Sequence, residues 1–479
     1  MSSLREEHRK KLYTFNPFAS KRPVYFEYKP KPGFTLEPVK VVSGLKLTSH
    51  AATQLVNPST WAFWDKVEML EDRSPGMIRE QFLMGCKYTL YPALTAAFGT
   101  DAPPSWNYLL HFGRNWKKNL KSGKLPVLLI PGAGDHAHRA YADPSYGIPG
   151  LNQSSGIAQY LDAAGFPVFA ITFSHPQGCN FIQYEQISGA IKRIRKVCNV
   201  NKVDLVAHSK GNIPARMYVS NMAGVYSQDL VFGNVKKYIT KMGIEELQYV
   251  NVVFPAKRWM SPFAYDVRRL VQLAAPNKGI DSTFRTFSSS AGAFVSKQAP
   301  IPFVRYFVKR DFAHDSIQES IYYEYNNPQE NNYFPGQCQI LYDLATEDVP
   351  LQNTLSSMDA VEKMYYGGHS LIGDSYGIEY AIAQGGNLID YLRIRGTSEY
   401  VEVATAVGTK NVVNVTYAGL PIPIMYEGVT SDGLLFKISA EDTRGINVSM
   451  GVYEFPINHL EMTYDSKISE WVEDILSYE

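Results

Sequence analysis

One serine of this chain lies in a context that can turn its hydroxyl into a nucleophile. Residues 203–211 are Val-Asp-Leu-Val-Ala-His-Ser-Lys-Gly. An apolar run typical of a strand ends at the serine, and Asn-Ile-Pro-Ala-Arg-Met-Tyr after Gly211 is able to continue as a helix. A strand, a tight turn and a helix in this order present a serine side chain at the end of a sheet. We therefore predict that Ser209 is a catalytic nucleophile.

A serine hydroxyl reacts at neutral pH only with a general base, an acid that orients the base, and donors for the oxyanion. We expect the acid and the base after Ser209, in the order Asp and then His. Asp432 follows an apolar stretch in a Ser-Asp-Gly turn, which would expose its carboxylate at a strand end. His459 follows Asn458 in a segment before the final helix. These residues are the preferred acid and base, although a turn aspartate and a loop histidine are the ordinary alternatives.

A second pair, Asp348 and His369, is also possible. Asp348 follows the apolar Ile340-Leu341-Tyr342, and His369 follows a glycine pair. This pair lies in the least regular part of the chain, and it would leave all residues after His369 as an appendage. The pair Asp432 and His459 is therefore preferred.

The oxyanion donors are expected from backbone N–H groups. Ile130-Pro131-Gly132-Ala133-Gly134-Asp135 follows the first clear strand, and such a glycine-rich strand end can turn its N–H groups toward a carbonyl oxygen. A second donor is the N–H of Lys210, at the positive end of the helix that follows the nucleophile. The alternative is that the two glycines only make a tight turn.

The elements around these residues predict an α/β fold. Strands are expected at Val127–Ile130, Val168–Ile171, Val203–Val206 and Leu270–Leu273, a helix at Tyr184–Val197, and an amphipathic helix around Ile468–Leu476. Strands that alternate with helices indicate a mostly parallel sheet with helices on both faces. We divide the chain into an N-terminal extension packing on the core (1–123), a first core part (124–281), a lid or cap insertion (282–398) and a second core part (399–479). The insertion is rich in phenylalanine and tyrosine, which either cover an acyl groove or pack as the core of a cap.

Composition limits the class of protein. The chain has 479 residues and a net charge of +1, so nothing favours nucleic acid as a partner. It has no apolar segment long enough to span a bilayer and no secretory signal in the sequence given, so we expect a cytoplasmic protein, with export left open. The four cysteines have no metal-ligand spacing and are interpreted as buried free thiols.

Five segments resemble bacterial triacylglycerol lipases of the α/β-hydrolase fold. They are similar to the oxyanion segment (126–134), the nucleophile segment (202–211), the segment after it (273–279), the acid segment (431–434) and the histidine segment (458–461) of those lipases. The resemblance implies the α/β-hydrolase fold, the triad Ser209, Asp432 and His459, and an oxyanion hole formed by the N–H groups of Ala133 and Lys210.

The chain departs from that family at several places. Ala207 stands where the first glycine of the nucleophile motif is usual. Many such lipases hold a structural calcium ion with an acid just after the histidine; Glu461 is in that position, but no convincing second acidic ligand is found. We therefore predict no metal and no cofactor.

These residues predict a serine carboxylic ester hydrolase, a lipase or esterase that cleaves apolar acyl esters through an acyl-enzyme on Ser209. The expected partner is the apolar ester itself, with peripheral contact to a lipid surface possible and the oligomeric state open. A depolymerase of an intracellular polyester such as polyhydroxyalkanoate, or an acyltransferase, is the alternative on the same fold. A binding protein on an inactive hydrolase fold is a third possibility, disfavoured by the intact Ser, Asp and His.

Overall fold

The structure is a computed structural model, and it describes most of the chain outside the N-terminus and the central insertion. The described residues are 37–51, 58–72, 80, 82, 87–147, 151, 153–222, 233–241, 244–252, 261–281, 285, 335–346, 348–351, 365–366, 368–369, 374–375, 378–379, 382, 387–417, 420–424, 426 and 428–478. Most of the predicted lid therefore lies outside the described residues. The division of the chain into four parts stays a prediction.

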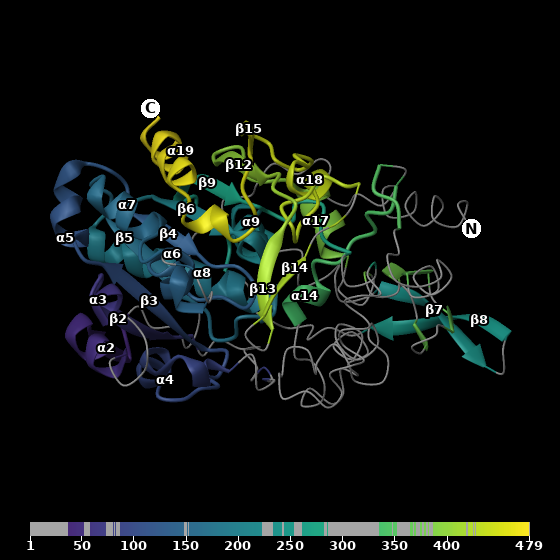
Figure 1. Cartoon of the computed structure of the whole chain (residues 1–479), viewed down its shortest axis with the longest axis horizontal. Coiled ribbons are helices and arrows are strands. Elements are labelled where there is room, and N and C mark those ends of the chain that lie inside the picture. The colour runs from purple at the N-terminus through teal and green to yellow at the C-terminus, as the bar shows by residue number, and fades with distance from the viewer. Residues whose placement is uncertain are drawn as a thin grey trace.

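A nine-stranded sheet forms the centre of the described structure (Figure 1). Its strands follow the order β1-β2-β3-β5-β4-β6-β9-β12-β15. Their bounds are Lys40–Ser43 for β1, Trp64–Glu71 for β2, Asn107–Gly113 for β3, Val127–Ile130 for β4, Val168–Thr172 for β5, Val203–His208 for β6, Val267–Leu273 for β9, Glu402–Gly408 for β12 and Ser449–Phe455 for β15. The four strands predicted between residues 127 and 273 are confirmed.

The sheet is parallel over most of its width. The pairs from β5 through β4, β6, β9 and β12 to β15 are all parallel. The first three strands complete the other edge through antiparallel pairs, so that β3 is antiparallel to β5. The carboxyl ends of the parallel strands consequently meet at one edge of the sheet, where ligands bind in open α/β sheets.

Helices cover both faces of this sheet. Their bounds are Gly44–Ala51 for α2, Pro58–Trp61 for α3, Pro92–Phe98 for α4, Trp116–Asn119 for α5, Ala137–Tyr141 for α6, Ile157–Ala163 for α7, Asn180–Cys198 for α8, Asn212–Val219 for α9, Pro335–Cys338 for α14, Leu388–Arg395 for α17, Lys437–Ala440 for α18 and Ser466–Ser477 for α19. The helices predicted around residues 184–197 and 468–476 correspond to α8 and α19. Figure 1 shows the C-terminal α19 beside α7.

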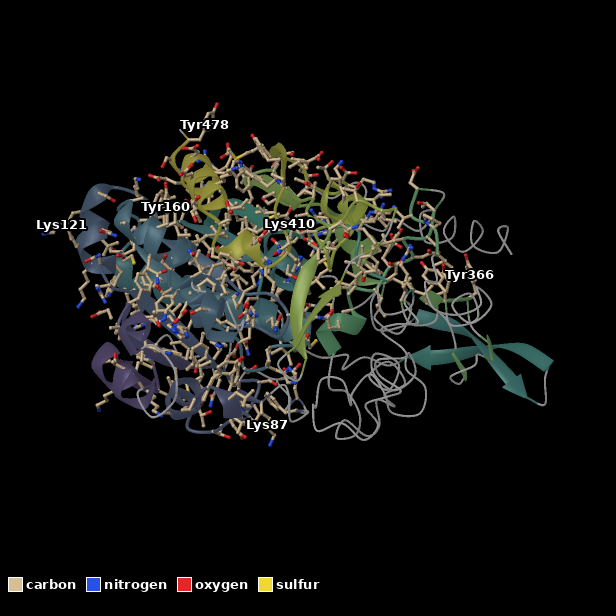
Figure 2. The ribbon with its side chains drawn as sticks, in the orientation of Figure 1. Lys87, Lys121, Tyr160, Tyr366, Lys410 and Tyr478 are labelled. Atoms are coloured by element: carbon tan, nitrogen blue, oxygen red, sulfur yellow. The ribbon has the colours of Figure 1, made fainter. Side chains whose placement is uncertain are left out.

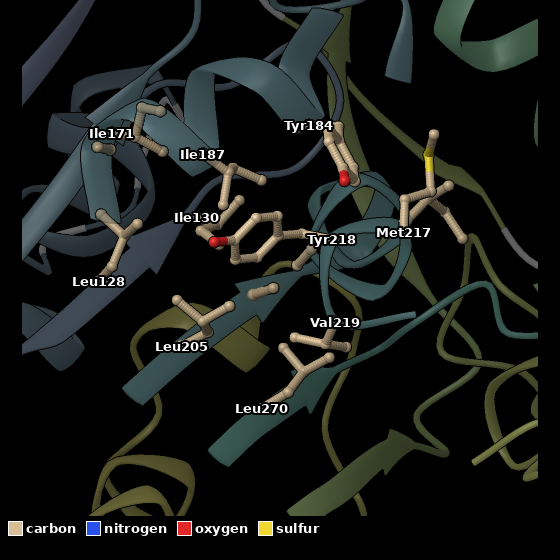
Figure 3. Close-up of a cluster of buried hydrophobic side chains, with 14 of the residues drawn as sticks. Leu128, Ile130, Ile171, Tyr184, Ile187, Leu205, Met217, Tyr218, Val219 and Leu270 are labelled. Carbon is tan, nitrogen blue, oxygen red and sulfur yellow. The ribbon is translucent and has the colours of Figure 1, made fainter. Parts of the chain in front are cut away.

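The apolar core lies in two layers, one on each side of the sheet. Leu128 and Ile130 of β4 face one layer, and Val127 and Leu129 face the other. This alternation follows from the two-residue period of a strand, and it explains why strands buried on both faces are continuously apolar. Figure 3 shows the first layer, in which Tyr184 of α8 and residues of α9 pack over the strands.

Three two-stranded ladders lie outside the central sheet. They are β7 (Gly233–Lys241) with β8 (Ile244–Val252), β10 (Gly368–His369) with β11 (Asp374–Ser375), and β13 (Val413–Tyr417) with β14 (Leu420–Ile424). Short 3-10 helices occur at 88–90, 120–122, 144–147, 209–211 (η5) and 461–463 (η9). In the described part of the chain, no helix has the length and apolar character needed to cross a membrane.

Candidate active site

Ser209 lies in a sharp turn between β6 and α9. Its backbone φ is +50°, in the left-handed region that non-glycine residues rarely adopt. The turn brings the chain close to the end of β4: a Cβ on Gly211 would lie 2.3 Å from the carbonyl oxygen of Pro131. Glycine is required at position 211 for this close approach. Asn212 fixes the turn, because its Nδ2 donates to the carbonyl oxygens of Ser209 (3.0 Å) and Leu273 (3.1 Å).

Ser209, His459 and Asp432 form one hydrogen-bonded chain. Ser209 Oγ lies 2.8 Å from His459 Nε2, and His459 Nδ1 lies 2.7 Å from Asp432 Oδ2. Ser209 is partly exposed, whereas Asp432 is 1% exposed and His459 6% exposed. A partly exposed serine, a buried imidazole and a buried carboxylate in this order match the arrangement that activates a serine.

The carboxylate of Asp432 is held by its own turn. Its Oδ1 accepts hydrogen bonds from the backbone N–H groups of Leu434 (3.0 Å) and Leu435 (2.7 Å), which leaves Oδ2 for His459. Asn411 stabilises this turn, because its side chain contacts the backbone of Tyr426 and the hydroxyl of Ser431. These bonds fix the direction from which the carboxylate approaches the imidazole.

The segment before His459 is stabilised by its polar neighbours. Asn458 Oδ1 accepts from the N–H groups of Leu460 and Glu461 (3.0 Å each), and the Asn458 N–H donates to Glu461 Oε2 (2.8 Å). The other oxygen of Glu461 lies 2.6 Å from Nζ of Lys410, which is labelled in Figure 2. Glu461 thus forms an ion pair here. Among the described residues, no group of three or more His, Cys, Asp or Glu side chains could hold a metal ion.

The glycine-rich turn after β4 packs against the serine. A Cβ on Gly132 would lie 2.9 Å from Ser209 Cβ and 3.1 Å from His208 Nδ1, so only glycine fits there. The adjacent N–H groups of Ala133 and Lys210 donate no hydrogen bond within the described part of the chain. Backbone N–H groups without an acceptor can serve as oxyanion donors, and the assignment of the oxyanion hole to Ala133 and Lys210 stays a prediction.

The strand order and the turn at Ser209 together identify the fold class. The serine follows a central strand of a mostly parallel sheet, and the Asp and His follow later strands at the same sheet edge. The chain has the α/β-hydrolase fold. This confirms the fold predicted from the sequence.

Comparison with known proteins adds remote similarities only. No protein-family model and no curated protein matches the chain. Among solved structures, it is similar to the Bacillus licheniformis lipase BlEst2 in its mature form (11% identity, TM-score 0.33, 74% of this chain and 92% of that one). It is also similar to a thermostable carboxyl esterase from Bacillus coagulans in complex with glycerol (11%, 0.33, 78% and 93%) and to the Paleococcus ferrophilus monoacylglycerol lipase (11%, 0.29, 74% and 93%).

The side chain of Lys210 is buried, which the sequence did not predict. Lys210 is 2% exposed, and its Nζ donates to Oε1 of Gln183 on α8 at 2.5 Å. A Cβ on Gly336 of α14 would lie 2.2 Å from Lys210 Cε, so α14 packs directly on this side chain. Burial lowers the pKa of Lys210 from its ordinary 10.5 to about 7, opposed in part by the charge of Glu80. The Lys210 amine is therefore partly neutral at neutral pH.

The alternative pair of acid and base does not meet the serine in the described structure. Asp348 is exposed, and His369 lies in the short strand β10, paired with Asp374. The histidine that contacts Ser209 is His459. Sequence reasoning gave no role to His208, although its place directly before the nucleophile was a signal.

Proposed function

We propose that this protein is a serine carboxylic ester hydrolase, of the lipase or esterase type, with Ser209 as nucleophile. The observation that carries the proposal is the hydrogen-bonded chain from Ser209 through His459 to Asp432, at 2.8 and 2.7 Å. These distances are within the reach required for proton transfer between a nucleophile and its base.

In the first half of the proposed reaction, Ser209 Oγ attacks the carbonyl carbon of the ester, and His459 Nε2 takes the hydroxyl proton. Asp432 keeps the proton on His459 Nδ1 and stabilises the imidazolium that forms. The N–H groups of Ala133 and Lys210 donate to the oxyanion of the tetrahedral intermediate, and each such donor contributes about 3 kcal/mol in comparable sites. The intermediate collapses to an acyl-enzyme as His459 returns its proton to the leaving alcohol.

In the second half, water attacks the acyl-enzyme while His459 again takes a proton, and the carboxylic acid leaves as Ser209 is regenerated. The class of substrate, apolar acyl esters, is proposed from the lipase-like segments of the sequence. Peripheral contact with a lipid surface is part of the same proposal, because water-insoluble esters are met at such surfaces.

The test is an ester chain-length scan with the purified protein and p-nitrophenyl esters from acetate to palmitate. We expect turnover that depends on chain length and that falls to the uncatalysed rate in Ser209→Ala. Turnover that survives in Ser209→Ala, or no turnover on any ester of the series by the folded protein, would overturn the proposal. Addition of alcohol acceptors or of polyhydroxyalkanoate to the same assay separates hydrolysis from acyl transfer and depolymerisation.

A further inference from the structure

His208 lies where the nucleophile strand meets the segment that carries the base. It is the last residue of β6, directly before Ser209, with an extended backbone and a side chain that is 3% exposed. Its ring centre is 4.8 Å from the ring centre of His459. The reaction steps described above assign nothing to this buried imidazole.

Its hydrogen bonding determines which nitrogen carries the proton. His208 Nε2 lies 2.9 Å from the backbone carbonyl oxygen of His459. A carbonyl oxygen only accepts, so Nε2 must be the donor, and in a neutral ring Nδ1 is then without a proton.

The other nitrogen is enclosed. Nδ1 of His208 is buried without a hydrogen-bond partner among the described residues, and Gly132 approaches it so closely that a Cβ there would lie 3.1 Å away. A proton on Nδ1 would be a buried donor with no acceptor, and burying such a donor raises the free energy of the folded protein. Burial, and next the neighbouring His459, lower the pKa of His208 well below its ordinary value. The ring therefore stays neutral while His459 gains and loses its proton.

The backbone of His459 is held from two sides. Its N–H donates to the carbonyl oxygen of Asp432 at 2.9 Å, and its carbonyl oxygen accepts from His208. The bonds to Asp432 join His459 to its own C-terminal part of the chain. Within the described residues, the bonds that join His459 to the nucleophile turn are those from His208 and Ser209.

We propose that His208 is a positioning residue: its Nε2–H fixes the backbone of His459 so that the imidazole stays within reach of Ser209 Oγ. His208 bonds the backbone of His459, and Ser209 bonds its ring. Because His208 and Ser209 are consecutive, both parts of His459 are held by the same short segment. The bond to the backbone persists when the Ser209–His459 bond breaks during proton transfer. This inference rests on the proposed catalytic role of Ser209 and His459.

The test compares His208→Leu with His208→Gln. Loss of the donor lets the base move, and misplacement of a catalytic group lowers turnover with little change in ground-state binding. We expect kcat to fall about tenfold or more in His208→Leu with KM changed by less than about twofold. The glutamine amide N–H reaches nearly as far as Nε2, so His208→Gln should recover most of kcat.

The matched control is His111→Leu. His111 is a buried histidine of β3 whose Nε2 lies 2.9 Å from Thr172 Oγ1, and within the described residues it contacts none of the three triad residues. Its removal should lower the unfolding temperature without lowering kcat of the folded protein. A kcat within about twofold of wild type in folded His208→Leu, a loss confined to KM, or a His208→Gln variant no better than His208→Leu would each overturn the proposal.

A measurement on the wild-type protein decides the case if the variants do not fold. Histidine-selective ¹⁵N NMR at pH 7 should find the ring of His208 neutral with its proton on Nε2. Its coupling to the His459 carbonyl distinguishes it from His136, His138 and His175, which are also buried and accept hydrogen bonds at Nδ1. A proton on Nδ1, or a charged ring, would contradict the proposal. This result does not depend on turnover, so it is distinguishable from a failure of the proposed function, which Ser209→Ala tests.

Discussion

The buried amine of Lys210 should make the stability of this protein depend on pH in a defined window. Lys210 is 2% exposed, and its Nζ is bonded to the neutral side chain of Gln183. Within the described residues it forms no ion pair. Desolvation of the charged form lowers its pKa from 10.5 to about 7.

The sign of the effect follows from proton binding. Between pH 7 and 10.5 the unfolded chain keeps a proton on Lys210 that the folded protein has released. Stability therefore rises with pH across this window and is lowest below it. For these two pKa values the gain between pH 7 and pH 9 is about 2 kcal/mol.

The experiment is urea unfolding of wild type and Lys210→Met at pH 7, 8 and 9, followed by tryptophan fluorescence. Methionine fills a similar volume but does not titrate, and every other titrating group is shared, so the difference between the two proteins isolates Lys210. We expect this difference to move by about 2 kcal/mol in favour of wild type between pH 7 and 9.

The control is Lys121→Met, since Lys121 is an exposed lysine at the surface of the described structure (Figure 2). Its removal should leave the pH dependence unchanged. Parallel stability curves for wild type and Lys210→Met would refute the reasoning, because they would mean that the amine keeps its charge in the folded protein up to pH 9.

Three further predictions concern turnover. Asp432→Asn should keep the fold but lower kcat by about 10⁴, because the amide favours the wrong tautomer of His459; kinetics beside circular dichroism checks this. His459→Ala should abolish turnover while His369→Ala retains it, and the reverse pattern in folded proteins would contradict the choice of base. Gly132→Ala should lower kcat at least about a hundredfold, because its Cβ would lie 2.9 Å from Ser209 Cβ and would displace the serine. A variant with a normal kcat would contradict this prediction, because it would show that the backbone at residue 132 can move without displacing Ser209.

The sequence predicted the parts of the fold that are buried on both faces. The strands β4 and β5 were recognisable because their residues are almost continuously apolar, as the two core layers require, and β6 and β9 were recognisable through shorter apolar pieces. The meeting of Ser209 with Asp432 and His459 was predicted from their order and from their place in the regular C-terminal part of the chain, because Asp348 and His369 follow the serine in the same order. A mostly parallel sheet brings the ends of its strands to one edge, however far apart they are in sequence.

Other features depend on packing that no local pattern expresses. The strand β2 carries Asp65, Lys66 and Glu68 among its apolar residues, so its place in the sheet was not evident from the sequence; Glu68 is buried because it pairs with Arg193 of α8. The burial of Lys210 depends on α14, which arrives from a distant part of the chain. The hydrogen bond of His208 likewise could not be predicted from residue types, because its acceptor is the backbone carbonyl oxygen of His459, a group that every residue has.

The central claim is that Ser209 is the nucleophile of a serine hydrolase, and covalent labelling tests it most directly. A fluorophosphonate probe reacts with serines that a neighbouring base activates. We predict that the wild-type protein is labelled stoichiometrically, that peptide mapping finds the adduct on Ser209, and that Ser209→Ala and His459→Ala are not labelled. An unlabelled but folded wild type, an adduct on another residue, or labelling that persists in Ser209→Ala would contradict the account.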